Sequence, residues 1–157
     1  MSKEKTEPGI KSVAMNRKAR FNYHILETFE AGLVLQGWEI KSIRSGGVNI
    51  GEAYVRPFNG ELFLLNAHIN PYRFTHDKEV DPLRERKLLM NADEIYKISG
   101  KVQSKGFTIV PLEIYLKRGR AKLKIALAKG KDAPDKRETI KAREAKREME
   151  RSIKSRK

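Results

Sequence analysis

The chain has 157 residues, enough for one folded domain with tails, and its 34 Lys and Arg outnumber its 20 Asp and Glu to give a net charge of +14. Cysteine is absent, which excludes disulfides and thiolate metal sites. The polar first residues lack the apolar core of a signal peptide, and no apolar run is long enough to span a bilayer. We therefore expect a cytoplasmic protein with a polyanionic partner, because Lys and Arg that neutralise phosphates release condensed counterions.

The positive charge is concentrated at the two ends of the chain. Residues 1–20 carry a net charge of +4 and residues 129–157 a net charge of +6, so 49 residues hold 10 of the 14 net charges. The second segment also contains no aromatic residue, Val or Leu, and cannot build a core. We expect a flexible N-terminus over residues 1–10, a folded domain over residues 11–128 and a basic tail over residues 129–157.

Residues 16–29 are predicted to form the first helix. Asn16 suits an N-cap, and Gly32 can end the helix. One face, at helical spacing, carries Phe21, Ile25, Leu26 and Phe29.

The charges of this helix would run against its dipole. The cations Arg17, Lys18 and Arg20 lie at the positive end, and the acids Glu27 and Glu30 lie at the negative end. This is either a chance arrangement of surface charge or a basic first turn that holds a phosphate.

The middle of the chain is predicted to be mostly strands. Leu33 and Leu35 alternate with polar residues, and Trp38 and Ile40 alternate in the other phase, which a bulge at Gly37 would explain. Asn49 with Glu52 is typical of a one-turn capped helix.

Turn and cap residues define the next elements. Residues 53–58 and 61–66 flank Asn59-Gly60, a strong hairpin signal, and residues 70–86 are predicted to form a long loop. Asn91 and Glu94 form a capping box for a helix through Val102 that ends near Gly106.

The last predicted hairpin turns at Arg118-Gly119. Its apolar face carries Val110, Leu112, Ile114, Leu116, Leu123, Ile125 and Leu127. Its other face carries Glu113, Tyr115, Lys117, Arg120, Lys122 and Lys124. An aromatic ring among cations suits a nucleic-acid-binding sheet, although an ordinary sheet with a solvated face has the same alternation. The fold class we expect is mainly β with helices: a small antiparallel OB-like β-barrel with flanking helices and a basic C-terminal tail.

Signals for catalysis are weak, and we expect no enzyme, cofactor or metal. The histidines His24, His68 and His76 lack metal-ligand spacing, and Ser45-Gly46-Gly47 is more typical of a turn than of a phosphate loop. A nuclease that uses His68 or His76 with a nearby Lys is a remote alternative.

The tail is predicted to become helical, with Asp135 as N-cap and Glu138 three residues on. Its apolar stripe is thin: Ile140, Ala142, Ala145, Met149 and Ile153. Such a helix is marginal alone in water, so we expect the tail to be disordered when free and to fold on a charged partner. A solubility tail is the alternative, and a membrane-surface helix is disfavoured because the stripe lacks bulky residues.

Several motifs resemble a known family. They are Asn16-Arg-Lys-Ala-Arg20 with Tyr23, Phe29-Glu-Ala-Gly32, Leu35-Gln-Gly-Trp-Glu-Ile-Lys-Ser-Ile-Arg44, Arg86-Lys-Leu-Leu-Met-Asn91, Lys122-Leu-Lys-Ile-Ala-Leu-Ala-Lys-Gly-Lys131 and Asp135-Lys-Arg137. Together they resemble small protein B, the SsrA-binding proteins, from about Ala14 to Lys157.

The resemblance implies a monomeric barrel that binds the tRNA-like domain of tmRNA, the SsrA RNA, and does not bind membranes. The pair would enter a ribosome stalled without a codon in its A site. The protein would stand in for the missing anticodon arm, with its tail in the empty mRNA channel. Translation would then switch to the tmRNA frame, and the nascent peptide would be tagged for proteolysis.

The resemblance also implies which residues bind. Those expected to bind tmRNA are Asn16, Arg17, Lys18, Arg20, Tyr23, Glu30, Lys41, Arg44, Lys87, Leu89, Asn91, Lys122 and Lys124. Those expected to bind the ribosome at its decoding centre and mRNA channel are Lys129, Gly130, Lys131, Asp135, Lys136, Arg137, Lys141, Arg143, Lys146 and Arg147. Glu30 would accept hydrogen bonds from base amino groups or orient a neighbouring Arg.

Two residues depart from the family pattern. Pro134 stands where relatives often carry His or Tyr, and a proline packs only weakly where an aromatic ring would stack on a base. Asp132 replaces a common basic residue. A structural ribosomal protein would have the same charge and the same kind of tail, and is the main alternative function. An RNA-modifying enzyme has no catalytic constellation to support it.

Overall fold

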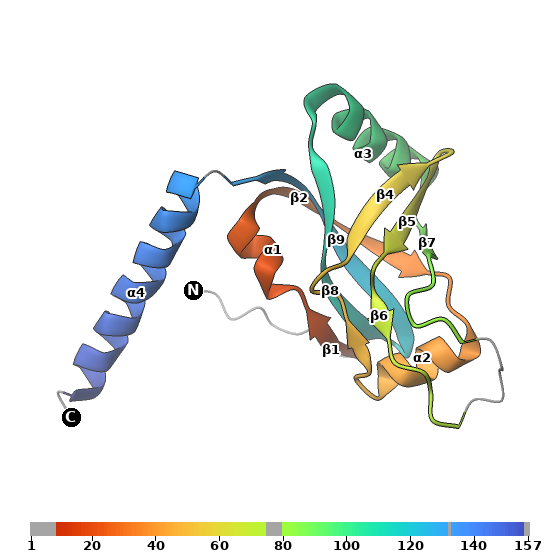
Figure 1. Ribbon diagram of the computed structural model, residues 1–157, viewed down its shortest axis with the longest axis horizontal. Helices are drawn as coiled ribbons and strands as arrows, with labels where there is room; N and C mark the ends of the chain where they lie inside the picture. The colour runs from red at the N-terminus through yellow and green to blue at the C-terminus, as the bar shows by residue number, and fades with distance from the viewer. Residues whose placement is uncertain (1–8, 75–79, 132, 156–157) are drawn as a thin grey trace.

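An antiparallel sheet that closes on itself forms the body of the protein in the computed structural model, which describes residues 9–74, 80–131 and 133–155 (Figure 1). The strands are β1 (Ile10–Met15), β2 (Tyr23–Leu33), β3 (Val48–Asn49), β4 (Tyr54–Phe58), β5 (Glu61–Leu65), β6 (His68–Ile69), β7 (Arg86–Leu89), β8 (Thr108–Lys117) and β9 (Arg120–Gly130). The helices are α1 (Arg17–Asn22), α2 (Gly37–Arg44), α3 (Ala92–Lys105) and α4 (Ala133–Ser155). The predicted OB-like barrel with flanking helices is confirmed.

The barrel closes through β8. Strand pairing runs β8-β4-β5-β7-β2-β9 and returns to β8, because β8 also pairs with β9, while β1 adds to the outer edge of β8. The short pair β3–β6 forms a separate ribbon. Figure 1 shows α2 and α3 toward opposite ends of the barrel. Full closure leaves few unpaired strand edges, which protects the sheet from pairing with other chains.

Two apolar clusters fill the barrel and its flank. The main core includes Trp38, Leu64, Ile98, Leu123 and Ile125, all less than 4% exposed. A smaller cluster beneath α1 contains Ala19, Val110, Leu112, Ala126 and Ala128. Small residues at the sheet surface let the short helix α1 lie close to β8 and β9.

A register shift in β8 separates these clusters and corrects the predicted alternation. The shift lies between Pro111 and Glu113, so Val110 and Leu112 pack under α1 while Ile114 packs in the main core. The alternation predicted from the sequence puts all three on one face. A bulge inserts one unpaired residue and reverses the side to which the following side chains point.

The first predicted helix is correct only at its start. Asn16 caps α1, and its Oδ1 accepts a hydrogen bond from the Ala19 N–H at 3.2 Å, but the helix ends at Asn22. Residues 23–33 form β2, which pairs with β9 along most of its length. Gly32 therefore lies within a strand, and Glu27 does not lie at a helix end but contacts Lys97 and Lys101 on α3. Long-range pairing outweighed the helical spacing of the apolar residues.

The second error concerns residues 37–44, which form α2 and not a bulged strand. Gln36 is the N-cap, and Glu39 Oε1 accepts a hydrogen bond from its backbone N–H at 2.7 Å. Trp38 is buried and donates from Nε1 to Gln36 Oε1 at 2.7 Å. Gln is a rare N-cap, so the helix start was not recognised. The predicted one-turn helix at Asn49 is a turn, in which Asn49 Oδ1 accepts from the Gly51 N–H.

The later elements match the sequence analysis. Strands β4 and β5 meet at Asn59-Gly60, and β8 and β9 meet at Arg118-Gly119, with positive φ angles at all four residues. Helix α3 begins after Asn91 and ends at the left-handed Gly106, although the Asn91 side chain makes no capping hydrogen bond. These turns need positive φ at both central residues, which Asn and Gly tolerate.

A buried ion cluster ties α2 to β7. Arg86, fully buried, donates from Nε to Glu39 Oε2 at 2.6 Å and from Nη1 to the Ala67 carbonyl at 2.6 Å. Arg84 bonds the other Glu39 oxygen. Burial alone would raise the pKa of Glu39, but hydrogen bonds from Arg84, the Gln36 backbone and Arg86 hold that pKa below its ordinary value. Burial lowers the pKa of Arg86, but an arginine stays protonated in proteins, so the cluster is ionic.

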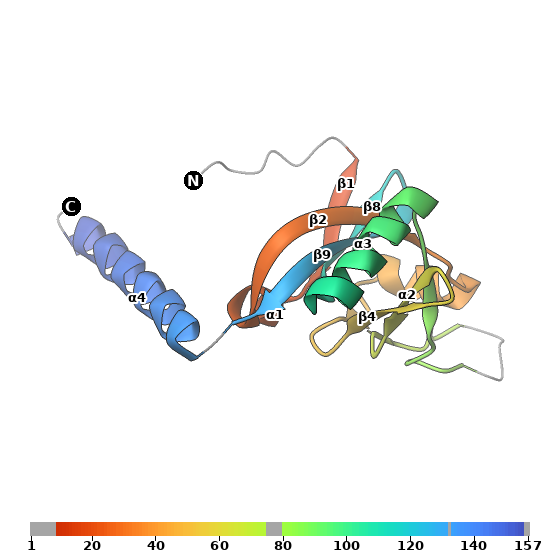
Figure 2. The same ribbon diagram turned by 90° about the horizontal axis from the view of Figure 1, so that it is seen from above.

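The tail leaves the barrel as a helix. Strand β9 continues through Lys129 to Gly130, two residues past the expected domain boundary. Helix α4 begins at Ala133, two residues before the predicted N-cap Asp135. Figure 2 shows α4 apart from the barrel, with α1 as the nearest element. The expected flexible segment over residues 1–10 lies outside the described residues except for Gly9 and Ile10, and Ile10 begins β1.

Candidate nucleic-acid interface

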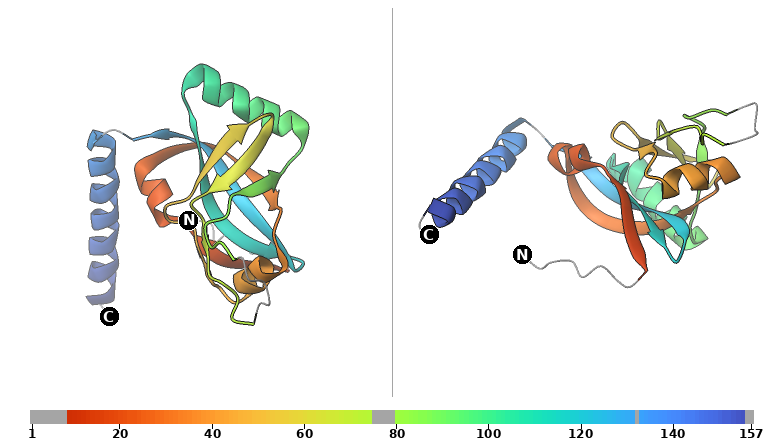
Figure 3. Two further views of the ribbon diagram at one scale, coloured as in Figure 1. Left: turned by 45° about the vertical axis from the view of Figure 1, so that its right-hand side comes forward. Right: turned by 90° about the horizontal axis from the view of Figure 1, so that it is seen from below.

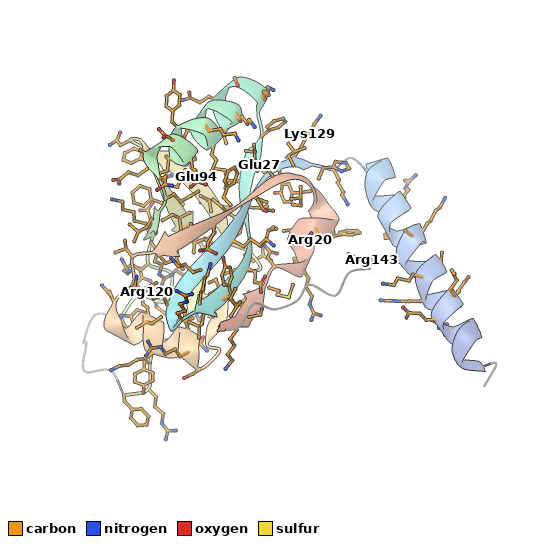
Figure 4. All side chains as sticks on the ribbon, turned by 180° about the vertical axis from the view of Figure 1, so that it is seen from behind. Arg20, Glu27, Glu94, Arg120, Lys129 and Arg143 are labelled. Atoms are coloured by element: carbon orange, nitrogen blue, oxygen red, sulfur yellow. The ribbon has the colours of Figure 1, made fainter. Side chains whose placement is uncertain are left out.

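The outward side of β8, β9 and β2 forms a charged surface, which we call the outer face and define by Glu30, Glu113, Tyr115, Lys117, Arg120, Lys122 and Lys124. Strand pairing places Lys124 between Glu30 and Glu113, and Lys122 beside Tyr115. Figure 4 shows Arg120 at the start of β9 and Lys129 near its end, so β9 runs along this face. Period-two alternation on β9 keeps Lys122 and Lys124 outside while Leu123 is buried.

Tyr115 is not the free stacking ring that the sequence predicted. Its side chain is 8% exposed, and its hydroxyl donates a hydrogen bond to Glu30. That bond, with Lys117 Nζ at 3.6 Å from Glu30 and Lys122 nearby, holds the pKa of Glu30 below its ordinary value. Glu30 is therefore a fixed carboxylate among cations, able to accept hydrogen bonds from base amino groups.

A groove of about 390 Å³ lies at one end of the outer face. Its walls come from β2, α2, β7 and the β8–β9 turn, and they include Arg44, Leu89, Arg120 and Lys122. Leu89 is 52% exposed, which is unusual for a leucine beside cations. A Cβ at Gly32 would lie 3.2 Å from the Leu89 Cβ, so a glycine lets β2 and β7 cross closely here. An apolar residue between cations can pack on a base while the cations bind phosphates.

A cleft of about 320 Å³ lies at the other end, where α4 passes α1. It is lined by Met15, Asn16, Arg17, Arg20, Leu112, Glu113, Lys124, Arg143 and Arg147. The Arg143 guanidinium lies over the Phe21 ring at 5.6 Å. In Figure 4, Arg20 and Arg143 lie on the facing sides of the two helices. A cation–π contact at an exposed site is worth about 0.5–1 kcal/mol.

A third hollow, of about 490 Å³, lies on the opposite side of α1. Lys18, Tyr23, Tyr54 and Thr108 line it together with Asn22 and Glu52. Lys18 Nζ lies 2.7 Å from Glu52 Oε1, and this ion pair lowers the pKa of Glu52. Helix α1 thus presents Lys18 to one hollow and Arg17 and Arg20 to another.

Comparisons with known proteins place this arrangement in a family. A family model described as SmpB protein matches residues 13–155. The chain is 53% identical over 148 residues to the SsrA-binding protein of Thermosynechococcus vestitus, covering 94% of this chain and 97% of that protein. The chain belongs to the SmpB family. The SsrA-binding protein of Symbiobacterium thermophilum is 52% identical over 157 residues, covering 99% and 98% of the two chains.

A solved structure described as "tmRNA-SmpB: a journey to the center of the bacterial ribosome" has the same SmpB fold. It shares 44% sequence identity with this chain, with a TM-score of 0.65, and the match covers 84% of this chain and 94% of that chain.

The residues predicted for tmRNA do not form one patch in this SmpB-family chain. Arg17, Arg20 and Lys124 meet at the cleft, whereas Arg44, Leu89 and Lys122 meet at the groove. Glu30 lies between the two, and Lys18 and Tyr23 line the third hollow.

The remaining predicted residues already have partners inside the protein or lie apart. Asn16 Nδ2 donates to the Pro111 carbonyl at 2.9 Å, and its side chain is buried. Lys41 lies over the Tyr72 ring, and Lys87 pairs with Glu61 at 2.7 Å. Asn91 is the N-cap of α3.

The residues predicted for the ribosome extend from the end of β9 along α4. Lys129 is exposed, Gly130 pairs with Tyr23 in the sheet, and Lys131 Nζ donates to the Arg20 carbonyl at 3.1 Å. Exposed on α4 are Arg137, Lys141, Arg143, Lys146 and Arg147. The side chains of Pro134, Asp135 and Lys136 lie outside the described residues, as does His76.

Three cations line the groove and the cleft without having been predicted for tmRNA. The period-two pattern placed Arg120 on the charged face with Lys122 and Lys124, but Arg120 was not named as a binding residue. Arg143 and Arg147 were predicted for the ribosome and also line the cleft. No sequence signal places Arg143 and Arg147 beside α1. Among the described residues, no cluster of three or more His, Asp or Glu is arranged to hold a metal ion. No helix in the described part of the chain has the length and apolar character to cross a membrane.

Proposed function

We propose that this chain binds the tRNA-like domain of tmRNA, the SsrA RNA, and brings it to ribosomes stalled without a codon in the A site. The observation that carries the proposal is a match to SsrA-binding proteins over nearly the full length of both chains. The binding chemistry supports it, because the outer face provides cations and a fixed carboxylate, and the groove at its end adds the exposed Leu89.

The outer face and its two ends are the proposed tmRNA site. Lys122, Lys124, Arg17 and Arg20 would bind phosphates and set the register of the RNA. Glu30 would accept hydrogen bonds from base amino groups, since its low pKa keeps it ionised at neutral pH. Leu89 would pack on an unstacked base in the groove.

The basic tail is the proposed ribosome-binding element. It would occupy the mRNA channel when the channel is empty, while the barrel replaces the anticodon arm of a tRNA. Translation would then move to the tmRNA reading frame and tag the nascent peptide. In this role the chain binds and positions RNA and performs no chemistry, and we propose that it acts as a cytoplasmic monomer.

Sequencing the RNA that co-purifies with the full-length chain tests the proposal. We expect tmRNA to be enriched far above its share of cellular RNA, and to remain after a wash at moderate salt. Stoichiometric ribosomal RNA of one subunit, without tmRNA, would instead identify a structural ribosomal protein and contradict the proposal.

A further inference from the structure

The cleft between α1 and α4 gathers positive charge without matching negative charge. Arg17 and Arg20 come from α1, Lys124 from β9, and Arg143 and Arg147 from α4, whereas Glu113 is the carboxylate in the lining. Within the described part of the chain, none of these five cations forms an ion pair. Five cations around one small hollow repel one another unless an anion lies between them.

Among the side chains of α4 that the structure describes, no apolar docking contact offsets that repulsion. Two members of the apolar stripe remain in solvent, with Ile140 42% and Met149 67% exposed. Between described side chains, α4 meets α1 through the cation–π pair of Arg143 and Phe21. Figure 3 shows the same separation of α4 from the barrel in two further views. The helix therefore meets α1 through its cations, and an anion bound between them would change repulsion into attraction.

We propose that this cleft binds backbone phosphates of an RNA strand and that the bound phosphates hold α4 against α1. The inference rests on the proposed RNA-binding function and deepens it, because residues assigned separately to tmRNA and to the ribosome here share one site.

An RNA backbone suits the cleft better than a small free anion. Arginine guanidiniums bind phosphate oxygens in pairs, and four of the five cations are arginines. They are spread over three elements, which matches a row of phosphates and not one ion. Lys124 also belongs to the outer face, so a strand bound there can continue into the cleft. Two RNAs have this chemistry: the tRNA-like domain of tmRNA and ribosomal RNA.

The helix provides a charge-matched control. Arg143 and Arg147 are four residues apart and line the cleft. Arg137 and Lys141 are also four residues apart and exposed, but they do not line the cleft, and helical geometry puts them on a different side of α4. The variants R143Q/R147Q and R137Q/K141Q therefore remove the same charge from the same helix.

The test measures the salt dependence of binding by the full-length chain to two RNA probes, the tRNA-like domain and an RNA helix from the ribosomal decoding centre. For the probe that enters the cleft, R143Q/R147Q should make the slope of log affinity against log salt shallower by about 1.4–1.8, at about 0.7–0.9 per phosphate contact. With the tRNA-like domain, R137Q/K141Q should keep the wild-type slope. With the decoding-centre helix, to which the whole tail is assigned, it should make the slope less shallow than R143Q/R147Q does. The probe on which the two variants differ identifies the source of the phosphates.

Equal slopes for both variants on both probes would overturn the proposal, because the tail would then act only through its overall charge. Failure of the proposed function would look different. In that case the wild-type chain would not prefer the tRNA-like domain over an ordinary tRNA, whatever the two variants did.

A distance measurement between two spin labels tests whether bound RNA fixes the position of α4 relative to the barrel. The chain has no cysteine, so Ser45→Cys with Ala145→Cys places one spin label on the barrel and one on the side of α4 away from the cleft. Adding the responding RNA should narrow the distance distribution in the wild-type background and leave it broad with R143Q/R147Q. An unchanged distribution in the wild-type background would overturn the proposed coupling.

Discussion

The barrel and the tail use charge in opposite ways. In the barrel the buried charges are neutralised inside the protein, as in the cluster of Glu39, Arg84 and Arg86, and Glu30 is held by Tyr115. In α4 the apolar residues Ile140 and Met149 face solvent, and cations line a cleft without ion pairs among the described residues. The barrel's shape therefore depends on its own contacts, whereas the position of α4 depends on the anion that neutralises its charge.

The largest expected effect comes from removing the tail. Truncation after Asp132 should leave the barrel folded, because both apolar clusters lie before residue 129. It should cost only a modest, electrostatic part of tmRNA affinity, yet abolish tagging on ribosomes stalled at the end of a message. Gel-shift affinity and an in vitro tagging assay measure the two effects. Normal tagging by the truncated chain would refute the proposed role of the tail.

Breaking the buried ion cluster should destabilise the barrel strongly. Glu39→Gln leaves Arg86 charged and without its carboxylate in a fully buried position, at a cost of about 3–5 kcal/mol. Denaturant unfolding of wild type and variant measures this, with Glu61→Gln in an exposed pair as the control. A loss as small as that of the control would mean that the cluster adds little to stability.

The same cluster predicts a loss of stability in acid. The pKa of Glu39 is lower in the folded protein than in the unfolded chain, so its contribution is complete above the unfolded value of about 4.5. It is lost as the pH falls through the folded pKa. Wild type should therefore lose stability below about pH 4.5 more steeply than Glu39→Gln, which unfolding curves at several pH values measure. Curves of stability against pH that run parallel for wild type and Glu39→Gln would contradict the assignment of this acid loss to Glu39.

How far the sequence could predict this structure depended on whether a signal was local. Turns at Asn59-Gly60 and Arg118-Gly119, the cap at Asn16 and the end of α3 at Gly106 depend on neighbouring residues and were predicted correctly. Residues 23–33 were not, because Ile25 and Phe29 fit both helical and strand spacing and only pairing with the distant β9 decides between them.

In the candidate site, too, only the residues with a local sequence signal were predicted correctly. Alternation on β9 identified Lys122 and Lys124, but the buried Tyr115 was mistaken for a free ring because its hydrogen bond to Glu30 on the distant strand β2 leaves no local signature. The convergence of Arg143 with Arg20 depends on tertiary structure and cannot be read from positions 123 residues apart.

A moderate effect is expected from the double variant K122A/K124A. Both side chains point outward, so the melting temperature should change little. The loss of two phosphate contacts should make the salt slope shallower by about 1.8, so the affinity lost between 50 and 200 mM salt becomes roughly tenfold smaller. The control K101A/K105A removes two charges from α3. Identical salt slopes for wild type, variant and control would exclude the outer face as the RNA site.

The smallest effect is expected from Lys18→Gln. Lys18 and its partner Glu52 are largely exposed, so the melting temperature should not change measurably. Binding of the tRNA-like domain should weaken by the loss of at most one phosphate contact. A clear fall in melting temperature with unchanged binding would show that Lys18 serves the fold.

The central claim is that the barrel selects the RNA and the tail does not. Competition between the tRNA-like domain of tmRNA and an ordinary tRNA, for full-length chain and for chain truncated after Asp132, tests it most directly. The account predicts that both forms prefer the tRNA-like domain by the same factor, although the truncated form binds both RNAs more weakly. A preference that disappears with the tail would contradict it.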